Sequence, residues 1–308
     1  MADRLLKFLF RGAPVRGEIV RLDESWQRMT RFHDYPPAVM ALLGQMTAAA
    51  ALLAANIKFN GALTLQIHGD GPVRLLVVEC QPDFRLRATA KLREGAAIAA
   101  DTALADLVNA HGSGRCLITL DPRDRLPGQQ PYQGVVPLAG DSIAAALESY
   151  MQQSEQLETR LWLAANGTTA TGVLLQKLPR EGGTASLADP GAEDDDAWPR
   201  ACVLAGTLRP DEMLAASGET LAQRLFWEEQ LDHMAPATPQ FACSCSRDRI
   251  GRMLRSMGRA EVDGIIAEQG QVEVTCDFCN ARQTFDAVDV GQLFATGGTQ
   301  GLDTERPH

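Results

Sequence analysis

Hydrophobic and polar residues alternate over several short stretches of residues 1–179, which is the pattern of β-strands that bury one face. Two of these stretches, residues 62–67 and 73–78, flank the sequence His-Gly-Asp-Gly-Pro at 68–72 and predict a β-hairpin. The other predicted strands are residues 15–22, 84–92, 115–120 and 159–163. Hairpin signals outnumber strand–helix–strand units, so we expect a large and mainly antiparallel sheet.

Two helices are predicted among these strands. The first begins near Pro37, because proline suits the first turn of a helix, and runs to about Ile57. The second begins after Asp141 or Ser142, either of which can cap its N-terminus. Residues 1–179 are therefore predicted to form an α+β domain in which helices pack on the sheet.

The composition changes after this domain. Residues 180–199 contain glycine-rich turns and the acidic run Glu193-Asp-Asp-Asp196, and we expect them to be flexible because they can bury little apolar surface. Residues 198–227 have helical spacing again, but glycine, proline and polar residues divide them into short helices. Short helices are marginal alone in water, so these helices must pack on a neighbouring part of the chain. We interpret residues 180–238 as a flexible helical linker.

Two close pairs of cysteines near the C-terminus, Cys243 with Cys245 and Cys276 with Cys279, are the strongest chemical signal in the chain. Four thiolates in two pairs are typical ligands of tetrahedral Zn²⁺. We therefore predict that these four cysteines bind one zinc ion per chain. The second pair lies within residues 272–285, where we expect a strand, a tight turn and a returning strand.

The metal site is predicted to lie in a small C-terminal domain, residues 239–290. Ser246 can cap a helix that ends at Gly258, and a second short helix precedes the cysteine hairpin. Burial alone cannot stabilise about 50 residues with so few large apolar side chains, so metal binding has to contribute to folding. Any linker helices that pack on this domain would loosen when the metal is lost. Residues 291–308 are predicted to be a disordered tail.

Oxidation offers this cluster a role beyond stabilisation. Thiolates on Zn²⁺ are nucleophilic toward peroxide or hypochlorous acid, and oxidation would consume the ligands and release the ion. The sulfurs within each pair can join, easily across C-x-x-C and with some strain across C-x-C. Disulfides that close such short loops stabilise no fold in place of the metal. The cluster is therefore either a permanent structural site or a switch that is folded when reduced and unfolded when oxidised.

Charge and composition narrow the function classes. The chain has 29 basic and 39 acidic residues, so extensive binding to nucleic acid or an anionic membrane is disfavoured. Its N-terminus lacks the apolar core of a signal peptide, and we expect the cysteines to be reduced in the cytoplasm. The apolar residues 41–57 are mostly alanine and are interrupted by Gln45 and Thr47, which favours a buried helix over a membrane span.

Other candidate residues have simpler interpretations. Cys80, Cys116 and Cys202 lie in apolar surroundings and are interpreted as small core residues. His233 is an alternative metal ligand, but four thiolates already complete a tetrahedral site. Three arginines are expected on one helical face beside acidic residues, forming a solvated face and not a phosphate site: Arg252, Arg255 and Arg259.

Several sequence motifs resemble one known family. The sharpest are Cys243-Ser-Cys-Ser-Arg-Asp-Arg249, Glu261-Val-Asp-Gly-Ile-Ile-Ala-Glu-Gln-Gly270 and Val272-Glu-Val-Thr-Cys-Asp-Phe-Cys-Asn280, and Phe226-Trp-Glu-Glu229 lies upstream of them. They are similar to the bacterial redox-regulated holdase chaperones, the 33 kDa heat shock protein family. The resemblance covers nearly the whole chain, and the cysteine spacing falls inside the family pattern.

The resemblance implies an N-terminal domain that binds substrate and dimerises, a thermally labile linker and a C-terminal redox switch. It also implies that oxidation forms the Cys243–Cys245 and Cys276–Cys279 disulfides, releases zinc and unfolds the linker and the switch. The activated protein, a homodimer, would then hold unfolding client proteins without ATP under oxidative stress. The sequence contains no G-x-x-x-x-G-K-[ST] loop that would bind ATP phosphates.

Two functions of other classes stay open. A nucleic-acid-binding protein with a purely structural zinc ribbon would bind RNA or DNA while the metal is bound. A thiol oxidoreductase would use Cys276 and Cys279 catalytically, but the sequence lacks the strand–helix setting of such enzymes and leaves the C-x-C pair without a role. No Ser-His-Asp or Cys-His pair can be proposed, so we expect a protein that is not an enzyme.

Overall fold

The computed structural model describes residues 2–56, 60–124, 130–138, 140–179 and 196–295. The chain divides into two compact units between Ala242 and Cys243, and each unit is described by itself. The predicted flexible run at 180–195 and residues 296–308 of the predicted tail lie outside the described residues.

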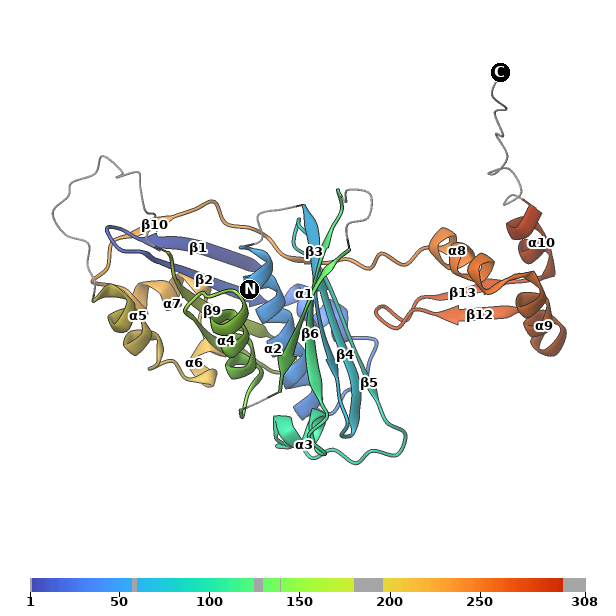
Figure 1. Cartoon of the computed structure of the whole chain (residues 1–308), viewed down its shortest axis with the longest axis horizontal. Coiled ribbons are helices and arrows are strands. Elements are labelled where there is room, and N and C mark those ends of the chain that lie inside the picture. The colour runs from blue at the N-terminus through green and yellow to red at the C-terminus, as the bar shows by residue number, and fades with distance from the viewer. Residues whose placement is uncertain (1, 57–59, 125–129, 139, 180–195, 296–308) are drawn as a thin grey trace, which may run out of the picture. The chain divides into compact units, whose positions relative to one another are not determined.

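The N-terminal unit contains two sheets (Figure 1). In spatial order, the first consists of β10 (Leu231–His233), β1 (Arg4–Phe10), β2 (Val15–Leu22), β9 (Ala170–Lys177) and β8 (Thr159–Ala165). The second consists of β11 (Gln240–Phe241), β5 (Arg85–Leu92), β4 (Val73–Cys80), β3 (Gly61–His68), β6 (Arg115–Pro122) and β7 (Tyr132–Pro137). Neighbouring strands are antiparallel except β11 and β5, which are parallel. The predicted α+β class with mainly antiparallel strands is confirmed, but the strands form two sheets and not one.

Helix α2 (Pro37–Ala54) lies between the two sheets (Figure 1). It contacts β2, β8 and β9 of the first sheet and β3, β4 and β5 of the second. Its alanines occupy little volume, so both sheets can approach the helix closely. Among the described residues it is the one helix long and apolar enough to cross a membrane, but most of it is buried in this unit. The prediction of a buried helix is confirmed; it ends three residues before Ile57.

The N-terminal unit also contains the helices α1 (Glu24–Thr30), α3 (Leu104–Val108) and α4 (Ile143–Ser154). Ser142 caps α4, because its hydroxyl accepts a hydrogen bond from the N–H of Ala145 at 3.1 Å. Of the two predicted caps, Ser142 is therefore the one used. Helix α4 packs on β7 and β8 and so contacts both sheets.

The helices of the predicted linker pack on the other face of the first sheet (Figure 1). They are α5 (Ala197–Ala205), α6 (Pro210–Ala215) and α7 (Gly218–Leu225). Their apolar side chains, including Met213 and Leu221, share a buried cluster with Phe8 and Val173 of the sheet. The prediction that these short helices need a neighbour is confirmed. That neighbour is the N-terminal sheet, so their packing does not require the cysteine-containing unit.

The C-terminal unit contains α8 (Arg247–Met257), α9 (Arg259–Gln269), the hairpin of β12 (Val272–Thr275) and β13 (Arg282–Phe285), and α10 (Ala287–Ala295). Both predicted helices and the hairpin are confirmed. The prediction of a disordered tail is wrong for residues 291–295, which belong to α10. Asp286 and Asp289 explain this, because each carboxylate accepts a hydrogen bond from the backbone N–H of the other at the start of the helix.

Candidate metal centre

The first pair of cysteines is positioned by the start of α8. Cys243 and Cys245 directly precede this helix, and Ser246 caps it: the Ser246 hydroxyl accepts a hydrogen bond from the N–H of Arg249 at 3.2 Å. The Arg249 side chain also donates to the hydroxyl of Ser244 at 2.7 Å, between the two cysteines. The cap therefore fixes where the C-x-C segment ends and the helix begins.

The second pair lies in the turn between β12 and β13. The N–H of Cys276 donates to the carbonyl of Ala281 at 2.9 Å, and the N–H of Asn280 donates to the carbonyl of Cys276 at 2.8 Å. Asn280 has a φ of 55°, a left-handed conformation that asparagine tolerates better than most residues. The chain can therefore reverse directly after Cys279, which leaves both sulfurs on one turn.

The four sulfur atoms converge with the spacing of a tetrahedral metal site. The Sγ atoms of Cys243 and Cys276 are 3.6 Å apart, and those of Cys245 and Cys279 are 3.3 Å apart. All four lie within 4.8 Å of one another. Thiolates bound to tetrahedral Zn²⁺ at about 2.3 Å are about 3.8 Å from each other, so the cluster is close to the size that zinc requires. The structure thus brings all four predicted ligands together.

Burial makes two of these thiols, those of Cys245 and Cys279, hard to ionise without a cation. Burial, with the sulfurs of Cys279 and Cys243 close by, raises the pKa of Cys245. Burial also acts to raise the pKa of Cys276, but the N–H groups of Phe278 and Cys279 donate to its sulfur and hold the net pKa below its ordinary value. Burial is the largest influence on Cys279, whose pKa is raised. A bound divalent metal would offset the cost of burying the negatively charged thiolates, because its charge neutralises them.

The arginines near the cysteines are divided between two helices, α8 and α9. The expectation that Arg252, Arg255 and Arg259 share one helical face is wrong, because Gly258, with a φ of 94°, ends α8 and places Arg259 in α9. Arg259 pairs with Asp263 at 3.1 Å. For Arg259, this exposed ion pair agrees with the interpretation as a solvated charge.

Comparison with known proteins identifies the family of this chain. A sequence profile of the Hsp33 protein family matches residues 3–286. The chain belongs to the Hsp33 family. It is 47% identical over 300 residues to the 33 kDa chaperonin of Methylobacillus flagellatus, which covers 96% of both chains. It is 42% identical over 306 residues to the 33 kDa chaperonin of Pseudomonas aeruginosa, which covers 99% of both chains.

A solved structure agrees with this assignment. The crystal structure of the 33 kDa chaperonin of Thermotoga maritima, a heat shock protein 33 homolog, matches with a TM-score of 0.76. It covers 96% of this chain and 98% of that chain at 21% identity, so it supports the fold. The resemblance seen in the sequence is confirmed, and the family and its relatives identify the chain as a chaperone.

The remaining cysteines of this Hsp33 family chain lie outside the cluster. Cys80 and Cys116 are buried in the N-terminal core, and burial raises the pKa of each thiol to about 12. Cys202, in α5, is half-buried, and burial raises its pKa to about 11. The prediction of small core residues is confirmed for Cys80 and Cys116, whereas Cys202 is only partly buried. His233, the alternative ligand, is on β10 of the N-terminal unit, where it packs against the ring of Phe8.

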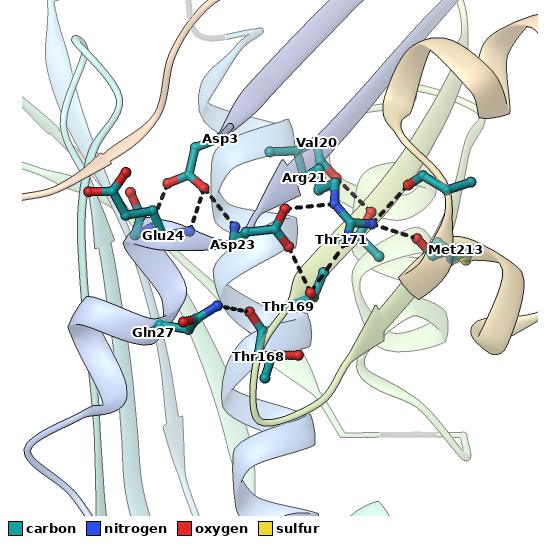
Figure 2. Close-up of polar contacts among 12 residues, drawn as sticks. Asp3, Val20, Arg21, Asp23, Glu24, Gln27, Thr168, Thr169, Thr171 and Met213 are labelled. Carbon is teal, nitrogen blue, oxygen red and sulfur yellow. Dashed lines mark hydrogen bonds and ion pairs between the residues drawn. The ribbon is translucent and has the colours of Figure 1, made fainter. Parts of the chain in front are cut away.

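A buried polar network joins the linker helices of this Hsp33 family chain to the first sheet, and sequence analysis missed it (Figure 2). Arg21 of β2 donates to the carboxylate of Asp23 at 2.9 Å and to the carbonyl of Ala216, directly after α6, at 2.8 Å. A longer hydrogen bond of 3.3 Å reaches the carbonyl of Met213. The hydroxyl of Thr169 donates to Asp23 at 2.7 Å. No local pattern marks this role of Arg21, because Met213 and Ala216, the linker residues whose carbonyls it binds, are 192 and 195 residues away in the sequence.

The same network extends to the N-terminus. The carboxylate of Asp3 accepts hydrogen bonds from the N–H groups of Asp23, Glu24 and Ser25 at 2.6, 2.9 and 2.7 Å, at the start of α1 (Figure 2). A carboxylate suits this position because a helix N-terminus carries unpaired N–H groups and partial positive charge. The network therefore connects the N-terminus, β2, α1 and the end of α6 in one buried site.

Proposed function

We propose that this chain is a redox-regulated, ATP-independent holdase, which binds unfolding proteins under oxidative stress and prevents their aggregation. The observation that carries the proposal is the convergence of four sulfurs within 4.8 Å in a unit with a small apolar core. In the reduced state, Cys243, Cys245, Cys276 and Cys279 bind one Zn²⁺ and hold this unit folded.

Oxidation removes the ligands from the metal. Two thiolates give two electrons to hydrogen peroxide, which takes up two protons and becomes two water molecules, and the two sulfurs form one disulfide. Two such steps produce Cys243–Cys245 and Cys276–Cys279 and release the zinc ion. The sulfurs closest in the folded unit belong to different pairs. Once the unit opens, the short spacer within each pair makes closure of the local loops entropically easier than joining distant segments.

The two units should respond differently to loss of the metal. Among the described residues, the buried apolar core of the C-terminal unit consists of Ile250, Leu254, Val262, Val272, Phe285 and Val290. The N-terminal unit has two larger cores of its own and contains no part of the cysteine cluster. Zinc loss would therefore unfold the C-terminal unit, while the N-terminal unit keeps its fold and supplies the surface that binds clients. The resemblance to the family adds a cytoplasmic location and a homodimer in the activated state.

The test compares Cys279→Ser with Cys116→Ala. Loss of one ligand should weaken zinc binding and leave the C-terminal unit partly unfolded, so reduced Cys279→Ser should suppress aggregation of a heat-unfolded client without oxidant. Cys116→Ala removes a cysteine outside the cluster, so it should stay inactive until peroxide is added, as the natural chain does. Light scattering and zinc release to a chromogenic chelator are measured together. A Cys279→Ser protein as inert as the reduced natural chain would refute the mechanism.

A further inference from the structure

Residues 230–242, here named the edge segment, end directly before Cys243 and lie along one edge of both sheets (Figure 1). Strand β10 in this segment pairs with β1, and β11 pairs with β5. Between them, the N–H of Leu5 donates to the carbonyl of Ala237 and the N–H of Ala237 donates back to Leu5, both at 2.9 Å. Without the edge segment, β1 and β5 would be the outermost strands of their sheets.

The edge segment is attached by backbone hydrogen bonds, by an ion pair between Asp232 and Arg11, and by the packed side chains of Leu231, Ala237 and Phe241. The N–H of Met234 donates to the carbonyl of Lys7 at 2.9 Å, and the N–H of Ala242 donates to the carbonyl of Leu86 at 3.1 Å. The side chains of residues 232–236 are all exposed. Main-chain pairing does not depend on the identity of the side chains, so an extended peptide of a different sequence can form the same hydrogen bonds.

The composition of the edge segment protects the strands beneath it. Pro236 and Pro239 have no N–H, so a further strand cannot pair easily with the outer side of the segment. Strand β1, by contrast, reads Arg-Leu-Leu-Lys-Phe-Leu-Phe and contains no proline. A strand with five apolar residues in seven and no proline can pair with another chain once its edge is free.

We propose that the activated protein binds its clients by strand addition: extended segments of an unfolding polypeptide replace the edge segment on β1 and β5. This inference rests on the proposed function, because release of the edge segment follows from unfolding of the unit that begins at Cys243. An unfolded chain attached at Ala242 favours fraying of a segment whose hydrogen bonds are at the surface. Recognition through the backbone accounts for clients of unrelated sequence.

Hydrogen exchange resolved by residue tests the proposal on the full-length protein. The amides of Leu5 and Arg11 donate to the edge segment, the latter to the carbonyl of Gln230 at 2.8 Å. The amide of Val20, in a strand between β1 and β9, is the internal control. On oxidation, exchange at Leu5 and Arg11 should become faster, on the order of 100-fold, while Val20 is unchanged. Addition of a permanently unfolded, carboxymethylated protein should slow Leu5 and Arg11 again.

A pair of proline variants tests release without oxidation. Ala237→Pro removes the N–H that donates to Leu5 and should detach the edge segment, so the reduced, zinc-bound variant should suppress aggregation at least about 10-fold more than the natural chain. Ala235→Pro is the matched control: the Ala235 side chain is exposed, and within the described residues its N–H donates no hydrogen bond to the backbone. This variant should stay inactive until oxidised.

The outcomes separate this inference from the proposed function. If oxidation fails to activate the natural chain, the proposed function is wrong. If oxidation activates it but Leu5 stays protected, or stays fast-exchanging with client bound, strand addition is refuted. Protection of Leu5 in oxidised protein without client, increasing with protein concentration, would mean that a second copy occupies the edge and would also overturn the proposal. Should Ala237→Pro fail to fold, the exchange experiment on the natural chain still decides.

Discussion

Arg21→Met is the sharpest test of how the linker helices are held. The substitution keeps an apolar stem of similar length but removes every donor that Arg21 supplies. In the structure Arg21 and Asp23 are 7% and 6% exposed and form an ion pair at 2.9 Å. The variant leaves the Asp23 carboxylate buried with the Thr169 hydroxyl as a remaining donor, and it leaves the carbonyl of Ala216 without its charged partner.

The magnitude follows from the burial of this pair. Removing one partner of a buried ion pair costs about 3–5 kcal/mol, because the other charge stays buried. For a unit of this size the loss lowers the Tm by on the order of 10 °C. Since Arg21 also anchors the end of α6, we expect the linker helices to loosen and basal suppression of client aggregation to rise in the reduced protein.

Circular dichroism during heating and light scattering with an unfolding client measure the two effects. Arg209→Met is the matched control, because Arg209 pairs with Asp211 near α6 but both side chains are more than 70% exposed. Such an exposed ion pair contributes little to the free energy of unfolding, so the Tm and the basal activity of Arg209→Met should not change. If Arg21→Met has the Tm of the control, the network does not stabilise the unit; if Tm falls but basal activity does not, the linker helices are not part of the switch.

Three further predictions follow from the structure. A strong chelator should remove about 10–16 kcal/mol of stabilisation from the C-terminal unit, which exceeds the net stability of so small a unit. The NMR signals of residues 243–295 should then lose their chemical-shift dispersion, while those of β1 stay unchanged. Dispersed signals of residues 243–295 after zinc removal would refute zinc-dependent folding. Burial raises the pKa of Glu18 from 4.5 to about 7, so the stability of the N-terminal unit should fall as pH rises between these values. Glu18→Gln should be up to about 3 kcal/mol more stable above pH 7, and equal urea unfolding at pH 8 would contradict this. Ser246→Ala removes the N-terminal cap of α8, so the free energy of unfolding of the C-terminal unit should fall by about 1 kcal/mol. The variant should therefore release zinc at a lower peroxide concentration than the natural chain. If zinc release shows the same dependence on peroxide concentration, the cap does not stabilise the metal site.

Local chemistry in the sequence was sufficient for much of this protein. The turn at residues 68–72, the caps Ser142 and Ser246, and the helix end at Gly258 were predictable because each depends on residues close together in the chain. The same holds for the cysteine cluster: two pairs of soft ligands predict a metal site by their type and spacing, and the structure brings the four sulfurs together.

Strands in which apolar and polar residues do not alternate could not be recognised from the sequence in this way. All but the last residue of β9 are buried, because helix α2 covers one face and the linker helices cover the other, so its sequence shows no period of two. The sequence also could not indicate that its strands form two sheets, or that Arg21 reaches the end of α6. An alternating pattern states that one face of a strand is buried but not what covers it. That choice depends on packing between segments distant in the chain, which only the tertiary structure decides.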